Sequence, residues 1–305
     1  MSDLRAASLP AAAKAGALAA ACCYLAWGVV PLYWKPLSHI NAVELIAHRH
    51  VWSLGFLALV VAAQRGLGEI GAALGRGRSV ALHLLSSCLL TANWLLYVWG
   101  VNTGHVIECS LGYFLVPLVN VAMGRFVLHE QLRRAQWIAI ALAAFGVGWM
   151  IVQLDRPPWI ALGLASSWGL YSLIRKQSPL GSLTGLTVET LLLAPFAIGF
   201  LWWRYRSGAG ALGHVDVRTH VWLMSSGIIT AVPLLLFAYG ARRIRLSTLG
   251  LLQYLAPTVQ LGLGVWLYRE PFSRERLFSF AFIWAGLVLY TVDNVLAQRR
   301  TTPAG

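Results

Sequence analysis

The chain consists of long apolar stretches separated by short polar segments. A helix needs about 20 apolar residues to cross the hydrocarbon core of a bilayer. Ten stretches of about this length are present, and each predicts a transmembrane helix. They cover residues 13–34, 41–63, 80–100, 107–128, 134–153, 158–174, 185–203, 219–240, 247–268 and 275–297. The sequence therefore predicts an all-α polytopic membrane protein with short tails and loops and no separate water-soluble domain.

The composition agrees with this interpretation. Only 11% of the residues are charged, whereas a soluble domain carries about 25%. The net charge of +13 would suit a nucleic-acid-binding protein, but Lys and Arg stand singly or in pairs between apolar runs. That distribution is typical of membrane loops. We therefore expect a lipid bilayer around the protein and no nucleic-acid partner.

The basic residues also indicate an orientation. With the N-terminus in the cytoplasm, 15 Lys and Arg residues, Arg175 among them, fall on the cytoplasmic side and 8 on the other. The positive-inside rule then places both termini in the cytoplasm. The first span is too long for a cleaved signal peptide. Tryptophans near span ends, such as Trp34, are expected in the interfacial aromatic belt.

The chain contains an internal repeat. Residues 94–150 align on 234–290 without a gap, and 12 of these 57 positions are identical, where composition alone would give about four. Matching pairs include Pro117 and Pro257, Glu130 and Glu270, Gly146 and Gly286, Trp27-Gly28 and Trp168-Gly169, and Lys35 and Lys176.

The repeat predicts two domains, residues 13–153 and residues 158–297, with five spans each. Because five is odd, the second half must enter the membrane from the opposite side, which makes an inverted repeat. Two inverted halves can rock about a shared site near the bilayer midplane, and this symmetry favours a transporter.

Five long segments are distinctive: ELIAHRHVW (44–52), NWLLYVWGVN (93–102), ECSLGYFLVPLVN (108–120), RLSTLGLLQYLAP (245–257) and FAFIW (280–284). They resemble the EamA transporters of the drug/metabolite transporter superfamily, and their RarD-like branch in particular. The resemblance covers nearly the whole chain and implies a ten-helix permease of the bacterial inner membrane that moves a small metabolite or drug.

The second span carries the most candidate chemistry. Glu44 and His48 lie one turn apart on one helix face, and histidine titrates near neutral pH. They form either a protonatable pair in the substrate pathway or a buried structural pair. Arg49 lies deeper, where a charge costs about 2.5–3.5 kcal/mol, so we expect it to bind an anionic substrate group or to pair with Glu44 or Glu108. A metal site with His50 lacks a further ligand, and no metal is expected.

The fourth span of each half contains one proline at an equivalent position. Pro117 and Pro257 each free the carbonyl one turn earlier, at Tyr113 and Gln253. Since a freed carbonyl in a membrane must face protein or water, we predict helix kinks toward an interior cavity, with packing alone as the alternative. Further pathway candidates are Asn93, Glu108, Asn120, Glu189 and Tyr254, and candidate gates or interfacial anchors are Lys35 and Lys176.

The sequence contains no motif of a hydrolase, a metalloprotease, a P-loop protein or a dinucleotide-binding protein. We therefore expect neither an enzyme activity nor a cofactor. Uphill transport would draw on an ion gradient, with H⁺ as the candidate coupling ion. A secondary transporter that uses alternating access is the leading hypothesis, and an intramembrane enzyme and a passive channel are the alternatives. The identity of the small-molecule substrate, the transport direction and a homodimeric state are left open.

Overall fold

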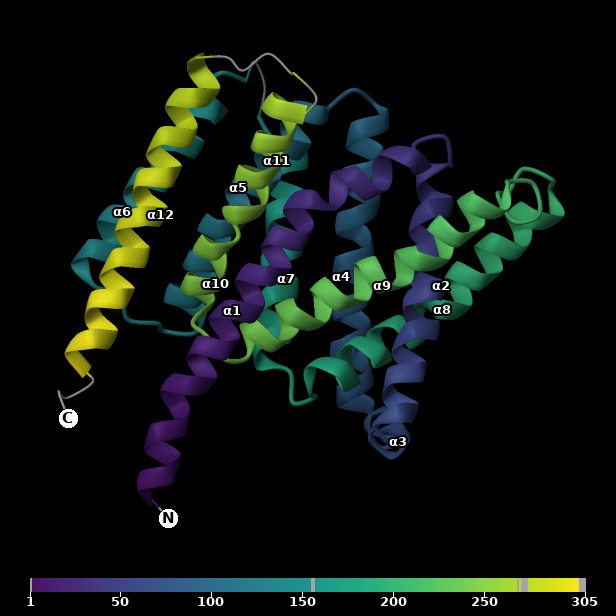
Figure 1. Cartoon of the computed structure of the whole chain (residues 1–305), viewed down its shortest axis with the longest axis horizontal. Coiled ribbons are helices and arrows are strands. Elements are labelled where there is room, and N and C mark those ends of the chain that lie inside the picture. Colours follow the sequence, from purple (N-terminus) through teal and green to yellow (C-terminus); the bar gives the residue numbers. More distant parts are fainter. Residues whose placement is uncertain (1, 155–156, 268, 270–273, 302–305) are drawn as a thin grey trace.

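The computed structural model describes residues 2–154, 157–267, 269 and 274–301. Within these ranges the chain is helical and contains no strand (Figure 1). The elements are α1 (Ser2–Trp34), η1 (Lys35–Leu37), α2 (Ala42–Ala63), α3 (Leu67–Leu74), α4 (Gly77–Asn102), α5 (Val106–Ala122), η2 (Met123–Val127), α6 (Arg134–Val152), α7 (Trp159–Gln177), α8 (Ser182–Arg206), α9 (Val217–Ala241), α10 (Leu246–Leu252), α11 (Leu255–Gly262), η3 (Leu263–Leu267) and α12 (Arg274–Thr301).

The prediction of an all-helical membrane protein is confirmed. Eight helices in the described part of the chain are long and apolar enough to cross a membrane. The predicted segments 158–174 and 247–268 do not meet that criterion. The first corresponds to α7, which is less apolar, and the second is divided into α10 and α11. Both segments pack among other helices, α7 against α4 and α5, and α11 against α1. A helix shielded from lipid can be more polar or interrupted.

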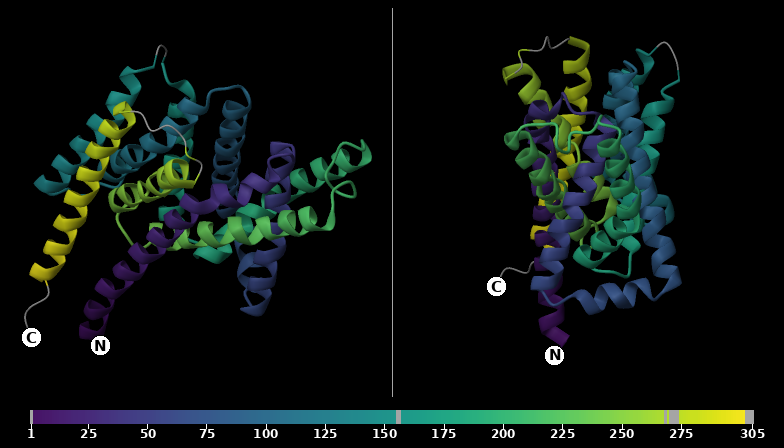
Figure 2. Two further views of the ribbon diagram at one scale, coloured as in Figure 1. Left: turned by 45° about the horizontal axis from the view of Figure 1, so that its top comes forward. Right: turned by 90° about the vertical axis from the view of Figure 1, so that its right-hand side faces the viewer.

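The start of α1 and the end of α12 lie at the same end of the bundle, together with the short helix α3, which the hydrophobic pattern did not predict (Figure 1). We call this the terminal end. The turn between α1 and α2 and the loop between α8 and α9 lie at the opposite end, which we call the far end (Figures 1 and 2).

Contacts between helices occur in matched pairs. Helix α1 packs against α9 and α11, and α7, its counterpart in the repeat, packs against α4 and α5. In the same way α2 packs against α9, and α8 against α4. Helix α6 packs along α12, its own counterpart, as Figure 1 shows at the left. The helix contacts of one half thus have counterparts in the other.

Close backbone approaches follow the same correspondence. A Cβ atom on Gly286 of α12 would lie 2.5 Å from the carbonyl oxygen of Ala139 on α6. A Cβ atom on Gly146 of α6 would lie 2.6 Å from the carbonyl oxygen of Ser279 on α12. Only glycine allows two helices to approach so closely. The aligned Gly146 and Gly286 therefore have the same packing role on the two helices.

The largest core lies where α1, α7 and α9 meet. The rings of Trp27 and Trp168, which align in the repeat, lie 5.2 Å apart. Both rings also contact Phe237 of α9. Aromatic side chains bury large areas, about 150–250 Å² each, so this cluster joins the two halves at the centre of the bundle.

Candidate functional site

Polar side chains on α2 lie at increasing depth from the far end into the bundle. Glu44 lies in the first turn of α2, Arg49 lies about 7.5 Å deeper along the helix axis, and Ser53 about 6 Å beyond it. In order of depth they belong to an open vestibule, an arginine site and an inner cavity.

The vestibule is a cavity of about 580 Å³ at the far end. Glu44 lines it, and its Oε1 accepts a hydrogen bond of 2.5 Å from the backbone N–H of Ala211. Its Oε2 accepts one of 3.2 Å from Nη2 of Arg204. Glu44 thereby holds the α8–α9 loop against α2. The vestibule is lined by Ser38, His39, Ile40, Asn41, Ala42, Glu44, Asn102, Arg204, Ala209, Gly210, Ala211 and Val215.

The same loop is fixed where α9 begins. Asp216 caps the helix by accepting a hydrogen bond of 3.3 Å from the backbone N–H of Thr219 and another from the Thr219 hydroxyl. These bonds favour the charged carboxylate. The pKa of Asp216 is therefore lower than usual, and the hydrogen bond from the Thr219 hydroxyl is the main cause.

The structure brings the predicted pair of Glu44 and His48 together without a hydrogen bond. Nε2 of His48 lies 3.9 Å from Oε1 of Glu44, which is too long for one. This nitrogen has no hydrogen-bond partner among the described residues. Both Glu44 oxygens already have partners on α8 and the loop, so the shared proton stays a prediction.

Arg49 occupies the arginine site, which we define as Arg49, Trp34, Trp94 and Thr230. The guanidinium carbon lies 4.7 Å from the ring centre of Trp34 and 4.2 Å from that of Trp94. Its Nε donates a hydrogen bond of 3.0 Å to the hydroxyl of Thr230. Trp34 was predicted to be interfacial but covers this cation, because the end of α1 crosses near α2.

No carboxylate in the described ranges pairs with Arg49. Of its two predicted partners, Glu44 binds Arg204, and Glu108 accepts a hydrogen bond of 3.4 Å from the backbone N–H of Ile160 at the start of α7. Each indole contact stabilises the guanidinium by about 0.5–2 kcal/mol. Placing the charge in the membrane costs about 2.5–3.5 kcal/mol. Arg49 is thus held by aromatic rings rather than by an anion.

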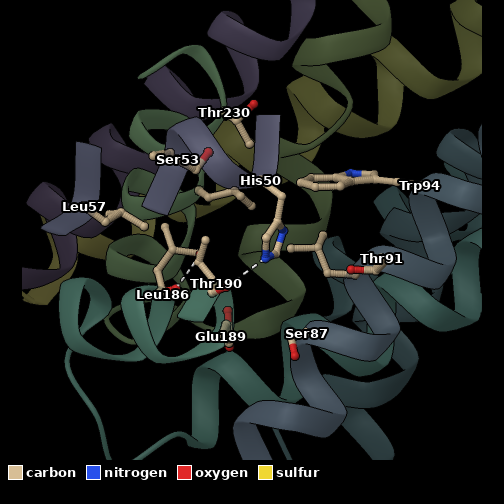
Figure 3. Close-up of a pocket in the computed structure, with 13 residues that line it drawn as sticks. His50, Ser53, Leu57, Ser87, Thr91, Trp94, Leu186, Glu189, Thr190 and Thr230 are labelled. Atoms are coloured by element: carbon tan, nitrogen blue, oxygen red, sulfur yellow. Dashed lines mark hydrogen bonds between the residues drawn. The ribbon is translucent and has the colours of Figure 1, made fainter. Parts of the chain in front are cut away.

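The inner cavity lies between α2, α4, α8 and α9, and Figure 3 shows its lining. It leaves about 20 Å³ for the centre of a water molecule, enough for a single water. Nε2 of His50 lies 2.8 Å from the carbonyl oxygen of Thr190 (Figure 3). Trp94 and Thr230 belong both to this lining and to the arginine site, so the two adjoin. The lining residues are His50, Ser53, Leu57, Ser87, Leu90, Thr91, Trp94, Leu186, Glu189, Thr190, Thr230, Ala231 and Leu234.

Glu189 lines the inner cavity and forms a buried ion pair. Its Oε1 accepts hydrogen bonds from Nη1 of Arg175 at 3.1 Å and from the Ser86 hydroxyl at 2.7 Å. Nη2 of Arg175 donates to the carbonyl oxygen of Ser182 at 3.2 Å. Arg175 was counted among the basic residues on the cytoplasmic side, outside the spans, whereas its side chain is fully buried inside the bundle. A buried carboxylate requires a nearby cation, and Glu189 draws Arg175 into the bundle.

Two predicted pathway residues join helices to α7 instead of lining the arginine site. Nδ2 of Asn93 on α4 donates to the carbonyl oxygen of Leu164 at 2.8 Å and to the hydroxyl of Ser167 at 2.9 Å. Glu108 lies against the first turn of α7, where the helix dipole favours a negative charge. Both contacts orient α7 within the bundle.

Asn120 lies fully buried on α5, where it packs near Gly250 of α10. Neither polar atom of its side chain has a hydrogen-bond partner in the described structure. A buried amide without partners is costly, so Asn120 keeps its place among the candidate pathway residues as a prediction.

The two prolines act differently. Helix α5 runs through Pro117, whereas the chain is interrupted between α10 and α11 just before Pro257. There the Gln253 carbonyl accepts a hydrogen bond of 3.1 Å from the backbone N–H of Ala256, so a tighter turn satisfies it. The Gln253 side chain is buried, and its Oε1 has no partner in the described ranges.

Two predicted tyrosines have different surroundings. Tyr254 is fully buried and donates a hydrogen bond of 3.2 Å to the Phe114 carbonyl oxygen. Tyr113 is half-buried, and its ring lies 5.5 Å from that of Tyr97. The role of both tyrosines in the substrate pathway stays a prediction.

The two aligned lysines lie at opposite ends of the bundle. Lys35 is exposed in η1 at the far end. Nζ of Lys176 donates to the carbonyl oxygens of Ala241 at 3.3 Å and Ile244 at 2.5 Å, at the terminal end. Lys176 thereby ties α7 to the turn between α9 and α10. Of the aligned glutamates, Glu130 accepts a hydrogen bond of 2.6 Å from the backbone N–H of Leu246, and Glu270 lies outside the described residues.

Sequence reasoning missed Trp94 and Thr230 as contacts of Arg49. The only signal for Trp94 is its place beside Asn93 in the segment NWLLYVWGVN. Thr230 stands out as a polar residue within an apolar span. In the part of the chain that the structure describes, no group of three His, Cys, Asp or Glu side chains converges as metal ligands would.

Comparison with known proteins assigns the family. The model of the EamA-like transporter family matches residues 14–152 and again residues 158–292. Protein RarD of Streptomyces exfoliatus is 42% identical over 91% of this chain and 88% of its own length, and Protein RarD of Escherichia coli is 37% identical over 95% and 98%. An uncharacterized transporter of Vibrio cholerae is 38% identical over 93% and 94%.

A protein of known crystal structure shares the fold. It matches 91% of this chain and 97% of its own, with a TM-score of 0.66 at 18% identity. Together with the family match over both halves, these similarities show that the chain belongs to the EamA-like transporter family and is a RarD-like member of it.

Proposed function

We propose that the protein is a secondary transporter that moves a small metabolite or drug across the bacterial inner membrane by alternating access. In this proposal residues 13–153 and 158–297 form two inverted five-helix halves with both termini in the cytoplasm. The repeated family match and the paired helix contacts support the two halves. The relatives that are named transporters support the function.

The proposal rests on one observation: Arg49 and the inner cavity lie between two ion pairs. Glu44 and Arg204 lie toward the far end, and Arg175 and Glu189 lie on the other side. The vestibule opens at the far end, and Glu189 of the second ion pair lines the inner cavity. In the proposed cycle, the far side closes over the substrate and the Arg175–Glu189 pair then separates to open the other side.

Proton coupling would act on the same ion pair. Oε2 of Glu189 has no hydrogen-bond partner among the described residues. A proton on this carboxylate would remove its attraction for Arg175 and so favour separation of the pair. The pH gradient would then drive the change between the two accessible states.

The test uses purified protein in liposomes under an imposed pH gradient, with pooled amino acids, nucleosides and antibiotics. We expect saturable uptake of at least one solute, accelerated by the gradient, and counterflow when the same solute is loaded inside. Flux that neither saturates nor shows counterflow would indicate a channel. Chemical conversion of a solute in detergent, without flux in liposomes, would indicate an enzyme. Either result would contradict the proposal.

A further inference from the structure

Arg49 and Arg175 are two arginines inside the same bundle, and their surroundings differ. Nη1 and Nη2 of Arg175 donate hydrogen bonds to Glu189 and to the Ser182 carbonyl oxygen. Arg49 donates only from Nε, to Thr230. Its two terminal nitrogens have no hydrogen-bond partner in the described ranges, and the side chain is half-buried. Arg49 therefore carries a charge and terminal N–H groups that no protein group in the described ranges accepts.

The free groups of Arg49 have a defined chemical preference. A guanidinium presents its terminal N–H groups as a planar fork, and this fork matches the two oxygens of a carboxylate. The rings of Trp34 and Trp94 lie against the cation and restrict where it can move. A receptor that is oriented before its ligand arrives loses less freedom on binding.

The position of Arg49 points to a ligand that enters from the far end. Glu44, five residues nearer the far end, is already neutralised by Arg204 and accepts a hydrogen bond from the backbone N–H of Ala211. The vestibule wall therefore presents a paired carboxylate to an entering anion, and the charge inside the arginine site is positive. Trp94 also borders the inner cavity, which holds only about one water, so a larger bound molecule would enter it only after the lining helices move apart.

We propose that the terminal N–H groups of Arg49 bind the carboxylate of a small organic anion, and that this anion is the transported substrate. The proposal names the substrate class and rests on the transport function proposed above. It assigns Trp34 and Trp94 the role of holding the guanidinium, and Thr230 the role of orienting it through Nε.

The test is ligand-dependent thermal unfolding of purified, detergent-solubilised protein. The ligands are sodium acetate, lactate, phenylacetate, glutamate and inorganic phosphate at up to about 100 mM, balanced with NaCl. Ligand binding to the folded state raises the unfolding temperature. We expect at least one carboxylate to stabilise the wild type. Its affinity should fall about tenfold or more in Arg49→Gln, and less in Arg49→Lys, which keeps the charge but loses the fork. The matched neutral amide, such as phenylacetamide for phenylacetate, should have no effect.

Arg243→Gln is the matched control. Arg243 is an exposed arginine whose guanidinium carbon lies 3.3 Å from the ring centre of Tyr239, so it too combines an arginine with an aromatic ring. We expect this variant to bind the carboxylate like the wild type. The proposal is overturned if no carboxylate stabilises the wild type, if stabilisation survives in Arg49→Gln, or if only inorganic phosphate gives an Arg49-dependent effect, which would indicate a phosphate ligand.

The assay separates this proposal from the transport function. Carboxylate binding that depends on Arg49, without flux in liposomes, would contradict the transporter and leave the anion site standing. Saturable uptake of a neutral solute, without carboxylate binding, would contradict the anion site and leave the transporter standing.

Discussion

Replacing Arg175 with methionine is expected to lower the stability of the folded protein by about 3–5 kcal/mol. The substitution leaves Glu189 buried inside the bundle without its cation, and only the Ser86 hydroxyl still donates to it. We expect most of the purified variant to aggregate on size-exclusion chromatography and the remainder to unfold at a clearly lower temperature than the wild type.

A second substitution provides the control for this prediction. Removing the partner as well, in Arg175→Met with Glu189→Leu, should recover most of the stability, because a buried ion pair replaced by apolar residues is often neutral or stabilising. Arg206→Met, at an exposed arginine near the end of α8, should change little. If Arg175→Met alone is as stable as the wild type, the Arg175–Glu189 pair does not hold α7 and α8 together.

Arg49→Met should have the opposite effect on stability and a large effect on transport. Arg49 has one hydrogen bond to protein and no carboxylate partner in the described structure. Methionine fills a similar space and makes favourable contacts with aromatic rings such as Trp34 and Trp94. We expect an unfolding temperature at least as high as that of the wild type, as is common when a binding residue is removed. Counterflow in liposomes should fall about 100-fold or more.

Two outcomes would contradict the role given to Arg49. A variant that aggregates as Arg175→Met does would show that the guanidinium is a structural element. A stable variant with wild-type counterflow would show that the substrate does not touch it. Glu44→Gln is a second variant to compare with Arg49→Met. It keeps an oxygen that can accept from the backbone N–H of Ala211, and it loses the ion pair with Arg204.

Much of the fold could be predicted from the sequence because helix length and hydrophobicity are local properties. Each apolar segment reappears as a helix or as adjoining helical pieces. The interruption lies just before Pro257, which has no backbone N–H to donate to the carbonyl one turn earlier. Pro117 shows the limit of the same rule, since α5 continues through it. Whether a proline interrupts a helix depends on the neighbours that pack against it.

The site could be predicted only in part, because its contacts join residues far apart in the chain. Arg49 was singled out from its depth in a span, but its contacts with Trp34 and Trp94 depend on how α1, α2 and α4 cross. The pairing of Arg175 with Glu189 was missed, since a basic residue near a span end normally faces water. The turn between α7 and α8 brings these two side chains together inside the bundle.

The most direct test of alternating access is a pair of distance measurements between spin labels in protein reconstituted in lipid nanodiscs. The labels are attached to cysteines introduced at exposed positions, in a background in which the four native cysteines are replaced by alanine. One pair, at Ser38 and Ser207, reports on the far end, and the other, at Gln64 and Gln177, reports on the terminal end. Changes in pH and addition of carboxylates shift the population of the two states.

Alternating access predicts reciprocal changes at the two ends. When the distance between Ser38 and Ser207 shortens, the distance between Gln64 and Gln177 should lengthen, because closure at one end accompanies opening at the other. A single, unchanged distance at each end under every condition, in protein that shows counterflow, would contradict alternating access.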